Sequence, residues 1–180
     1  MQDYQLSTNE LRETKPKRDE FKDIKRNSIV CVLDNLSNAY NIGIIIRTCE
    51  AFLIEKVFVC GNVDLIKSKK LLKTSRKTER WIKVETDRDT TETIKKLKYL
   101  GYEIVAVELT KNAIHYQKLA KKEKIAFVFG SEIYGISNEV LSQCDKSIYI
   151  PMFGMGNSLN VATSAGIVIS DFIFKKYKNI

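Results

Sequence analysis

The sequence predicts an α/β fold with a mostly parallel sheet flanked by helices. From residue 29 onward, short apolar runs alternate with helical or polar stretches, which is typical of strands and helices around a parallel sheet. At 180 residues the chain is long enough for one full hydrophobic core. Residues 147–170 contain no charged side chain, although 29% of the chain is charged. This stretch is too polar for a membrane span, so we expect it to fold against something buried.

The first 28 residues read as an extension that precedes a single domain over residues 29–180. They are polar and nearly balanced in charge, and they contain one proline. Ser7 and Glu10 have the spacing of a capping box, which predicts a short helix followed by a linker.

Five apolar runs predict the strands of the sheet. Each is short, rich in residues that favour strands, and bounded by residues that favour turns. The runs are residues 29–33, 57–60, 104–107, 125–129 and 148–150. Residues 81–84 are a candidate for one further strand.

Helices are expected between these strands and at the end of the chain. The predicted ranges are 42–52, 64–75, 90–99, 138–143 and 160–177. The last is the most strongly patterned, because apolar residues recur at helical spacing and basic residues follow where the helix dipole favours them. Its predicted apolar stripe is Val161, Ala165, Val168 and Phe172.

The net charge of +8 is concentrated in residues 67–83, which hold eight basic residues against one acidic residue, Glu79. A run of charge is usually a solvated helix face, but such a face mixes both signs. A surface that neutralises phosphates needs only positive charge, so the window favours a nucleic-acid partner. The candidate RNA-binding residues are Lys67, Lys69, Lys70, Lys73, Arg76, Lys77 and Arg80.

Several function classes are disfavoured by what the sequence lacks. The four cysteines have no CxxC spacing and there is one histidine, so we expect reduced thiols and no metal site. No GxGxxG or GxxxxGK[ST] motif is present, which argues against a dinucleotide crevice and a phosphate loop. With no signal peptide or membrane span visible, a cytoplasmic location is expected.

Glycine-bearing loops follow two of the predicted strands. Gly130 and Gly135 come after run 125–129, and the segment MFGMGNS comes after run 148–150. For any single glycine a tight turn is the better explanation. Because ligands bind at the carboxyl ends of parallel strands, two such loops together indicate a binding site.

Arg47 lies in an otherwise apolar stretch, residues 42–52. Burying a guanidinium without a partner is costly. Either Glu50 or Glu132 pairs with it, or it reaches into a site to hold an anionic group. Spacing alone leaves these alternatives open.

Three segments together resemble the motifs of the SpoU/TrmH-like RNA 2'-O-ribose methyltransferases of the SPOUT superfamily. The first is NIGIIIRT at residues 41–48, and the second is FGSEIYG at residues 129–135. The third combines IPM at residues 150–152 with SLNVA at residues 158–162. The resemblance runs from about residue 29 to the C-terminus, and three motifs in order are more specific than any one of them.

The resemblance implies an α/β-knot fold with a C-terminal trefoil knot that binds S-adenosylmethionine. It also implies a homodimer in which the partner subunit completes each site. The implied substrate is a ribose 2'-hydroxyl of structured RNA, either tRNA or rRNA, methylated without a metal.

The family's site residues carry over to matching positions of this chain. Arg47 corresponds to the catalytic arginine, which we expect to hold the ribose and a neighbouring phosphate, since arginine is a poor base. The other implied catalytic-site residues are Asn41, Glu132, Ser158 and Asn160. The implied cofactor contacts, largely main-chain groups, lie at Val107, Leu109, Gly130, Ile150 and Leu159.

Two other functions compete with ribose methylation. One is a non-catalytic RNA-binding protein that keeps the fold and the basic surface, and the other is a knotted base methyltransferase. The intact set of site residues argues against the first. Arg47 and the segment at residues 158–160 argue against the second.

The chain also departs from its relatives in having a fuller basic window, and the RNA-gripping domain and C-terminal extension of some relatives are not seen in it.

Overall fold

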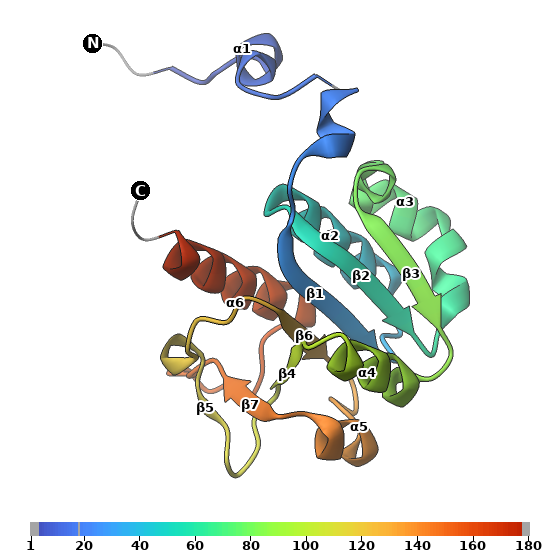
Figure 1. Cartoon of the computed structure of the whole chain (residues 1–180), viewed down its shortest axis with the longest axis vertical. Coiled ribbons are helices and arrows are strands. Elements are labelled where there is room, and N and C mark those ends of the chain that lie inside the picture. The colour runs from blue at the N-terminus through green and yellow to red at the C-terminus, as the bar shows by residue number, and fades with distance from the viewer. Residues whose placement is uncertain (1–3, 18, 178–180) are drawn as a thin grey trace.

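The computed structural model describes residues 4–17 and 19–177 and has a central sheet of seven parallel strands (Figure 1). The strand order across the sheet is β3-β2-β1-β6-β4-β7-β5. The strands are β1 (Asn27–Asp34), β2 (Ile54–Cys60), β3 (Lys83–Asp87), β4 (Glu103–Val107), β5 (Ile114–His115), β6 (Ile125–Phe129) and β7 (Lys146–Tyr149). Every pairing is parallel, as the alternating sequence pattern predicts.

Helices cover both faces of the sheet. They are α2 (Ala39–Ala51), α3 (Lys69–Ser75), α4 (Thr90–Tyr99), α5 (Asn138–Gln143) and α6 (Val161–Lys176), whereas α1 (Thr8–Glu13) belongs to the N-terminal extension. Alternate side chains of β1 point to opposite faces. Cys31 and Leu33 pack with residues of α2 and α6, whereas Val30 and Val32 pack with residues of α4 and α5. The central strands are therefore buried on both faces, which explains their continuous apolar sequence.

The five predicted strands are confirmed, and two differences concern the edges of the sheet. Residues 125–129 match β6 in full, and the other four overlap their predicted runs. The strand proposed at Trp81 begins two residues later, at Lys83, because residues 78–80 form a 3-10 turn. Strand β5 was not predicted, since two residues without an apolar run carry no strand pattern.

The predicted helices are also confirmed, except that one predicted range forms two separate elements. Residues 64–75 separate at Ser68 into a 3-10 turn (Val63–Lys67) and α3, because the Ser68 side chain accepts a hydrogen bond from the amide of Lys70 and caps α3. Helix α2 begins at Ala39, earlier than predicted, because the Asn38 side chain caps it by accepting a hydrogen bond from the Tyr40 amide. In α6, Ala165, Val168 and Phe172 are buried as the stripe predicts, and Val161 is half-buried.

Helix α3 packs closely against α2 at Gly43. A Cβ atom at this position would lie 2.1 Å from the Thr74 hydroxyl oxygen and 2.8 Å from the Leu71 carbonyl oxygen. Glycine thus allows the two helices to approach. The contact fixes the basic window of α3 alongside α2.

The N-terminal extension stands apart from the sheet (Figure 1). The predicted capping box is present, with Ser7 and Glu10 bonded reciprocally, and α1 has no buried residue. The extension meets the domain through Phe21, which packs edge to face on Trp81, and Arg26, which donates hydrogen bonds to the Ile54 and Trp81 carbonyl oxygens. The boundary at residue 28 stays a prediction, as does the trefoil knot.

Among the described residues, no helix has the length and hydropathy needed to cross a membrane. The same part of the chain brings together no group of three potential metal-binding side chains. All four cysteines are free thiols, and Cys31, Cys49 and Cys60 are buried.

Candidate active site

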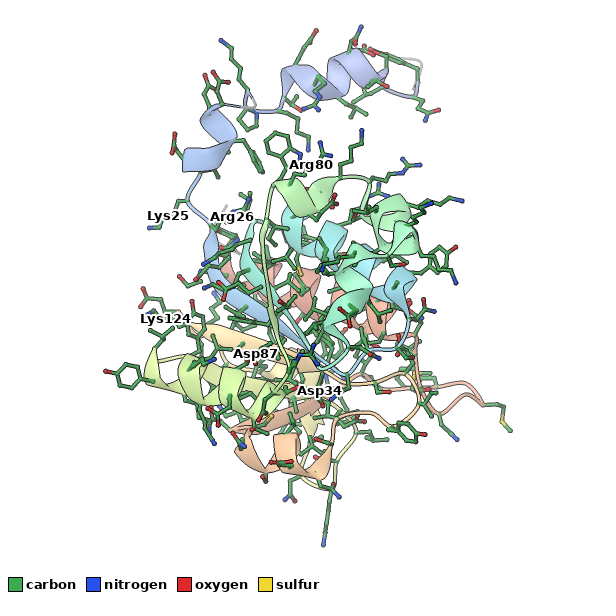
Figure 2. All side chains as sticks on the ribbon, turned by 90° about the vertical axis from the view of Figure 1, so that its right-hand side faces the viewer. Lys25, Arg26, Asp34, Arg80, Asp87 and Lys124 are labelled. Atoms are coloured by element: carbon green, nitrogen blue, oxygen red, sulfur yellow. The ribbon has the colours of Figure 1, made fainter. Side chains whose placement is uncertain are left out.

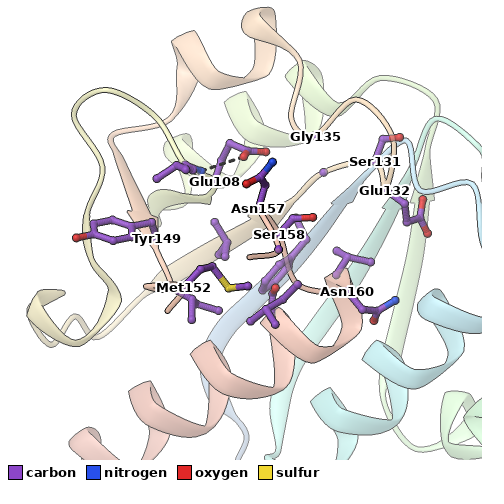
Figure 3. Close-up of a pocket in the computed structure, with 18 of the residues that line it drawn as sticks. Glu108, Ser131, Glu132, Gly135, Tyr149, Met152, Asn157, Ser158 and Asn160 are labelled. Atoms are coloured by element: carbon purple, nitrogen blue, oxygen red, sulfur yellow. Dashed lines mark hydrogen bonds between the residues drawn. The ribbon is translucent and has the colours of Figure 1, made fainter. Parts of the chain in front are cut away.

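A cavity of about 900 Å³ opens where strands β4, β6 and β7 end (Figure 3). Three segments line it: residues 107–109 after β4, residues 129–135 at the end of β6, and the stretch after β7 that leads into α6. These are carboxyl ends of parallel strands, where such sheets bind ligands. The two glycine-bearing loops therefore face one space, as the sequence predicts.

All five positions predicted to contact a cofactor line this cavity. They are Val107, Leu109, Gly130, Ile150 and Leu159. At Gly130 the reason for glycine is steric, because a Cβ atom would lie 2.2 Å from the carbonyl carbon of Gly135. The loop closes there through two hydrogen bonds between the main chains of Ser131 and Gly135. At these five positions the cavity wall is thus formed by backbone and by apolar side chains.

Several polar side chains in the cavity were not predicted, among them those of Glu108 and Asn157. Glu108 places its carboxylate there, accepting hydrogen bonds from the amides of Leu109 (2.9 Å) and Ile136 (3.2 Å). Asn157 also lines the cavity (Figure 3). Glu108 directly follows a predicted strand, which is the one signal in the sequence that could have identified it.

The Glu132 carboxylate is bound to the start of α2. It accepts hydrogen bonds from the Ser37 amide (2.9 Å) and hydroxyl (3.0 Å), the Asn38 amide (3.2 Å) and the Asn41 side-chain nitrogen (2.8 Å). These hydrogen bonds join residues that are 91 to 95 positions apart in the sequence. The second motif is therefore anchored to the first.

Asn41 extends this network to the third motif. Its side-chain oxygen accepts a hydrogen bond of 3.1 Å from the Asn160 side-chain nitrogen. The Asn160 oxygen in turn accepts from the amides of Ala162 and Thr163, so Asn160 is the N-cap of α6. One hydrogen-bond network thus runs from Glu132 through Asn41 to Asn160. Because Asn41 is 6% exposed, its partners also satisfy a buried polar group.

Hydrogen bonding keeps Glu132 ionised. Burial on its own raises the pKa of this carboxyl, but the hydrogen bonds from Asn41 and Ser37 outweigh it, and the pKa lies below its usual value. A carboxylate with a lowered pKa and occupied lone pairs is a weak base. The geometry suits a group that holds other residues in position.

Arg47 lies apart from this network. It is exposed on α2 and does not line the cavity. Its guanidinium has no hydrogen bond or ion pair with the described residues, so neither the Glu50 nor the Glu132 pairing is formed. Arg47 lies six positions after Asn41, which places the two side chains on different faces of the helix. The premise that Arg47 is buried was wrong.

Ser158 lines the cavity and is exposed. No hydrogen bond of its hydroxyl is formed within residues 4–17 and 19–177. The hydroxyl is therefore available to a bound molecule.

The seven basic residues predicted to bind RNA are all exposed. We call them the basic surface; none forms an ion pair with a carboxylate in the described part of the chain. The Lys70 ammonium lies 5.9 Å from the centre of the Tyr40 ring, and Tyr40 adjoins Asn41. The basic surface therefore extends to the first motif.

Comparison with known proteins identifies relatives over most of the chain. The model of the SpoU rRNA Methylase family matches residues 28–170. The chain is 28% identical to the tRNA (guanosine(18)-2'-O)-methyltransferase of Aquifex aeolicus, over 81% of this chain and 68% of that protein. It is also 28% identical to the protein of that name from Borreliella burgdorferi, over 93% of this chain and 76% of the relative. Across similar proteins the chain spans as little as 60% of the relative's length.

Solved structures share the fold. The A. aeolicus TrmH/SpoU tRNA modifying enzyme superposes with a TM-score of 0.80 at 24% identity, covering 89% of this chain and 83% of that one. The SpoU methyltransferase AviRb from Streptomyces viridochromogenes, solved in complex with AdoMet, has a TM-score of 0.79 at 18% identity. That match covers 90% of this chain and 65% of AviRb.

Proposed function

The chain belongs to the SpoU rRNA Methylase family, and from this we propose that it methylates a ribose 2'-hydroxyl of RNA with S-adenosylmethionine. It is an RNA methyltransferase whose substrate class is tRNA or rRNA, in keeping with the names of its relatives. The observation that carries the proposal is the network from Glu132 through Asn41 to Asn160. It joins the three motifs beside one cavity.

The cavity suits S-adenosylmethionine in size and chemistry. Its volume of about 900 Å³ is within the range of pockets that hold ligands of this size. Val107, Ile150 and Leu159 offer apolar walls for an adenine, and the main chain around Gly130 offers hydrogen-bonding groups. Glu108 adds acceptors for ribose hydroxyls. When bound, S-adenosylmethionine supplies a methyl group on a sulfonium, whose loss leaves a neutral thioether.

The residues of this chain orient the nucleophile. Asn41 and Asn160 are held by the network, and Ser158 presents a free hydroxyl to the ribose. Such positioning lowers the barrier by placing the reacting atoms in line.

Proton removal needs no strong base among these side chains. Arginine keeps its proton at neutral pH, and Glu132 is a weak base because its lone pairs are occupied. The proton of the attacking hydroxyl would therefore pass to solvent water as the new bond forms. Arg47 holds the phosphate next to the target ribose and keeps the hydroxyl in place.

A homodimer accounts for the position of Arg47. Arg47 is exposed and lies outside the cavity of its own subunit, on a helix face that also exposes Tyr40 and Ile44. Near the cavity, Phe153 is 96% and Met155 is 100% exposed. A second copy would cover these apolar side chains and bring its own Arg47 to the cavity.

Complementation between two inactive variants tests the dimer. Arg47→Ala and Ser158→Ala are each expected to be inactive alone, and subunit exchange between them should restore about a quarter of the wild-type activity if each site uses both subunits. Recovery should be absent when either variant is exchanged with itself. Failure to recover activity, with exchange verified by mass, would contradict a shared site.

Calorimetry separates this function from a non-catalytic RNA-binding protein. We expect the protein to bind S-adenosylmethionine with an affinity in the micromolar range, typical of enzyme ligands. No binding at millimolar concentration would favour the RNA-binding module instead. Mapping of 2'-O-methyl sites in cellular tRNA and rRNA, with and without the gene, would identify the nucleotide. A cytoplasmic location would give the enzyme access to these RNAs.

A further inference from the structure

A second cavity of about 360 Å³ lies between the N-terminal extension and the domain. It is on the side of the sheet where strands β1 to β3 begin, opposite the edge that holds the active-site cavity. Figure 2 shows the extension above Arg80 on this side. The residues that line it include six with charged or aromatic side chains: Arg12, Lys15, Phe21, Glu50, Arg76 and Trp81.

Helix α2 connects the two cavities. Asn41 lies near its start, beside the active site, and Glu50 lies near its end, in the second cavity. Nine residues of α-helix span about 14 Å. One RNA molecule bound at the active site can therefore also reach the second cavity.

An aromatic surface forms one wall of this cavity. Trp81 is partly exposed, and the Phe21 ring packs on it edge to face, with 5.7 Å between the ring centres. The Trp81 indole therefore contacts the extension through Phe21 and still lines the cavity. Unpaired bases of RNA stack on such aromatic side chains.

Three cations surround the same space. Arg12 and Lys15 come from the extension, and Arg76 belongs to the basic surface. All three are exposed, and none forms an ion pair with the described residues. They offer positive charge for a phosphate next to a stacked base.

Glu50 is the one acidic side chain among the residues that line the cavity. It is half-buried, and burial raises the pKa of its carboxyl, although Arg26 and Lys15 oppose this. Within residues 4–17 and 19–177 its carboxylate accepts no hydrogen bond. A carboxylate offers two acceptors side by side, which match adjacent N–H donors.

We propose that the second cavity binds a guanine nucleotide of the RNA substrate, away from the methylated ribose. The guanine stacks on Trp81 and donates its N1–H and N2–H to the Glu50 carboxylate, while Arg12, Lys15 and Arg76 hold its phosphate. Among the common bases, guanine alone presents two adjacent donors on its Watson–Crick edge. The proposal deepens the proposed function and rests on it for the identity of the ligand as RNA.

Trp81 is the single tryptophan of the chain, so its fluorescence reports on this cavity alone. Titration with guanosine 5'-monophosphate should give a saturable change in emission. Cytidine 5'-monophosphate should bind at least about fivefold more weakly, the smallest discrimination expected of a bidentate contact. Glu50→Gln should remove this preference, whereas Glu13→Gln, an exposed acid of α1 outside the cavity, should keep it.

Lys15→Ala provides a second variant that leaves the domain core untouched. It should weaken binding of guanosine 5'-monophosphate but not of guanosine, which has no phosphate. An unchanged Trp81 emission up to about 10 mM nucleotide, or equal affinity for both nucleotides, would overturn the proposal. Calorimetry with S-adenosylmethionine on the same sample tests the proposed function separately, because that cofactor binds in the other cavity.

Discussion

Glu132, Asn41 and Asn160 act as one unit although they are far apart in the sequence. Glu132 accepts hydrogen bonds from the start of α2, and Asn41 accepts from the residue that caps α6. Charge-assisted hydrogen bonds of this kind are stronger than neutral ones. The unit therefore fixes how the loop after β6 and the start of α6 meet at the cavity.

Glu132→Gln should destabilise the protein at neutral pH. An amide cannot accept all of the hydrogen bonds that the carboxylate accepts, so we expect a loss of about 1–3 kcal/mol in the free energy of unfolding. Urea denaturation at pH 7 measures this. Glu123→Gln, which replaces an exposed acid, is the matched control and should have no effect.

The effect of Glu132→Gln should also depend on pH. Because the pKa of Glu132 is lowered in the folded protein, its contribution to stability is full above the usual value of about 4.5 and is lost as the pH falls through the lowered value. The difference between wild type and variant should therefore shrink in acid. A difference that grows below pH 4.5 would contradict the lowered pKa.

Arg47→Ala should strongly reduce methyl transfer while leaving the cavity intact. Arg47 lies outside the cavity, so we expect normal binding of S-adenosylmethionine by calorimetry. Turnover on RNA should fall by about 100-fold or more, as for the loss of one group that holds charge in the transition state. Arg47→Lys should recover part of it, since lysine keeps the charge but not the planar fork. Wild-type turnover in Arg47→Ala would exclude a role in transfer.

Among the helices, the contact between α2 and α3 positions the basic surface. Gly43→Ala would bring a methyl group within 2.8 Å of the Leu71 carbonyl oxygen, so we expect a cost of about 1–3 kcal/mol. Gly166→Ala in α6 is the matched control, because no described atom outside the neighbouring residues of α6 lies within 4 Å of its new methyl group. That change should stabilise the protein by about 0.5–1 kcal/mol, as alanine favours helix. Thermal unfolding distinguishes the two.

The lysines of α3 should account for part of the salt dependence of RNA binding. Replacing Lys69, Lys70 and Lys73 with alanine should reduce the slope of log affinity against log salt by about 0.7–0.9 for each RNA phosphate that these lysines neutralise. Fluorescence anisotropy with labelled tRNA at several salt concentrations measures the slope. The matched control replaces three lysines of α4, each paired with a carboxylate. These are Lys95, Lys96 and Lys98. An equal effect of both triple variants would contradict a specific surface on α3.

In the whole molecule, the local sequence pattern predicts the helices and strands but not the contacts between them. Strand β6 is apolar throughout because both of its faces are buried, and its limits follow from the sequence alone. Strand β5 pairs with two residues of β7 and has no pattern of its own. Local pattern did not show that Asn41 meets Asn160, because they lie 119 positions apart in the sequence and only the tertiary fold brings them together.

The candidate site was proposed from its motifs, and other parts of it were missed for physical reasons. Motif resemblance led to Asn41, Glu132 and Asn160. The apolar neighbours of Arg47 suggested that its side chain is buried, but one side of α2 is exposed and Arg47 lies on that side. Glu108 is a single acid at a strand end, a common arrangement. The second cavity depends on contact between Phe21 and Trp81, which no sequence period indicates.

The position of the transferred methyl group distinguishes ribose methylation from base methylation. Purified protein would be incubated with S-adenosylmethionine carrying a tritiated methyl group and with unmodified tRNA and rRNA, and the RNA would then be digested to nucleosides. We predict that the label is recovered in 2'-O-methylnucleosides. Label in base-methylated nucleosides, or none despite bound cofactor, would contradict ribose methylation by this protein.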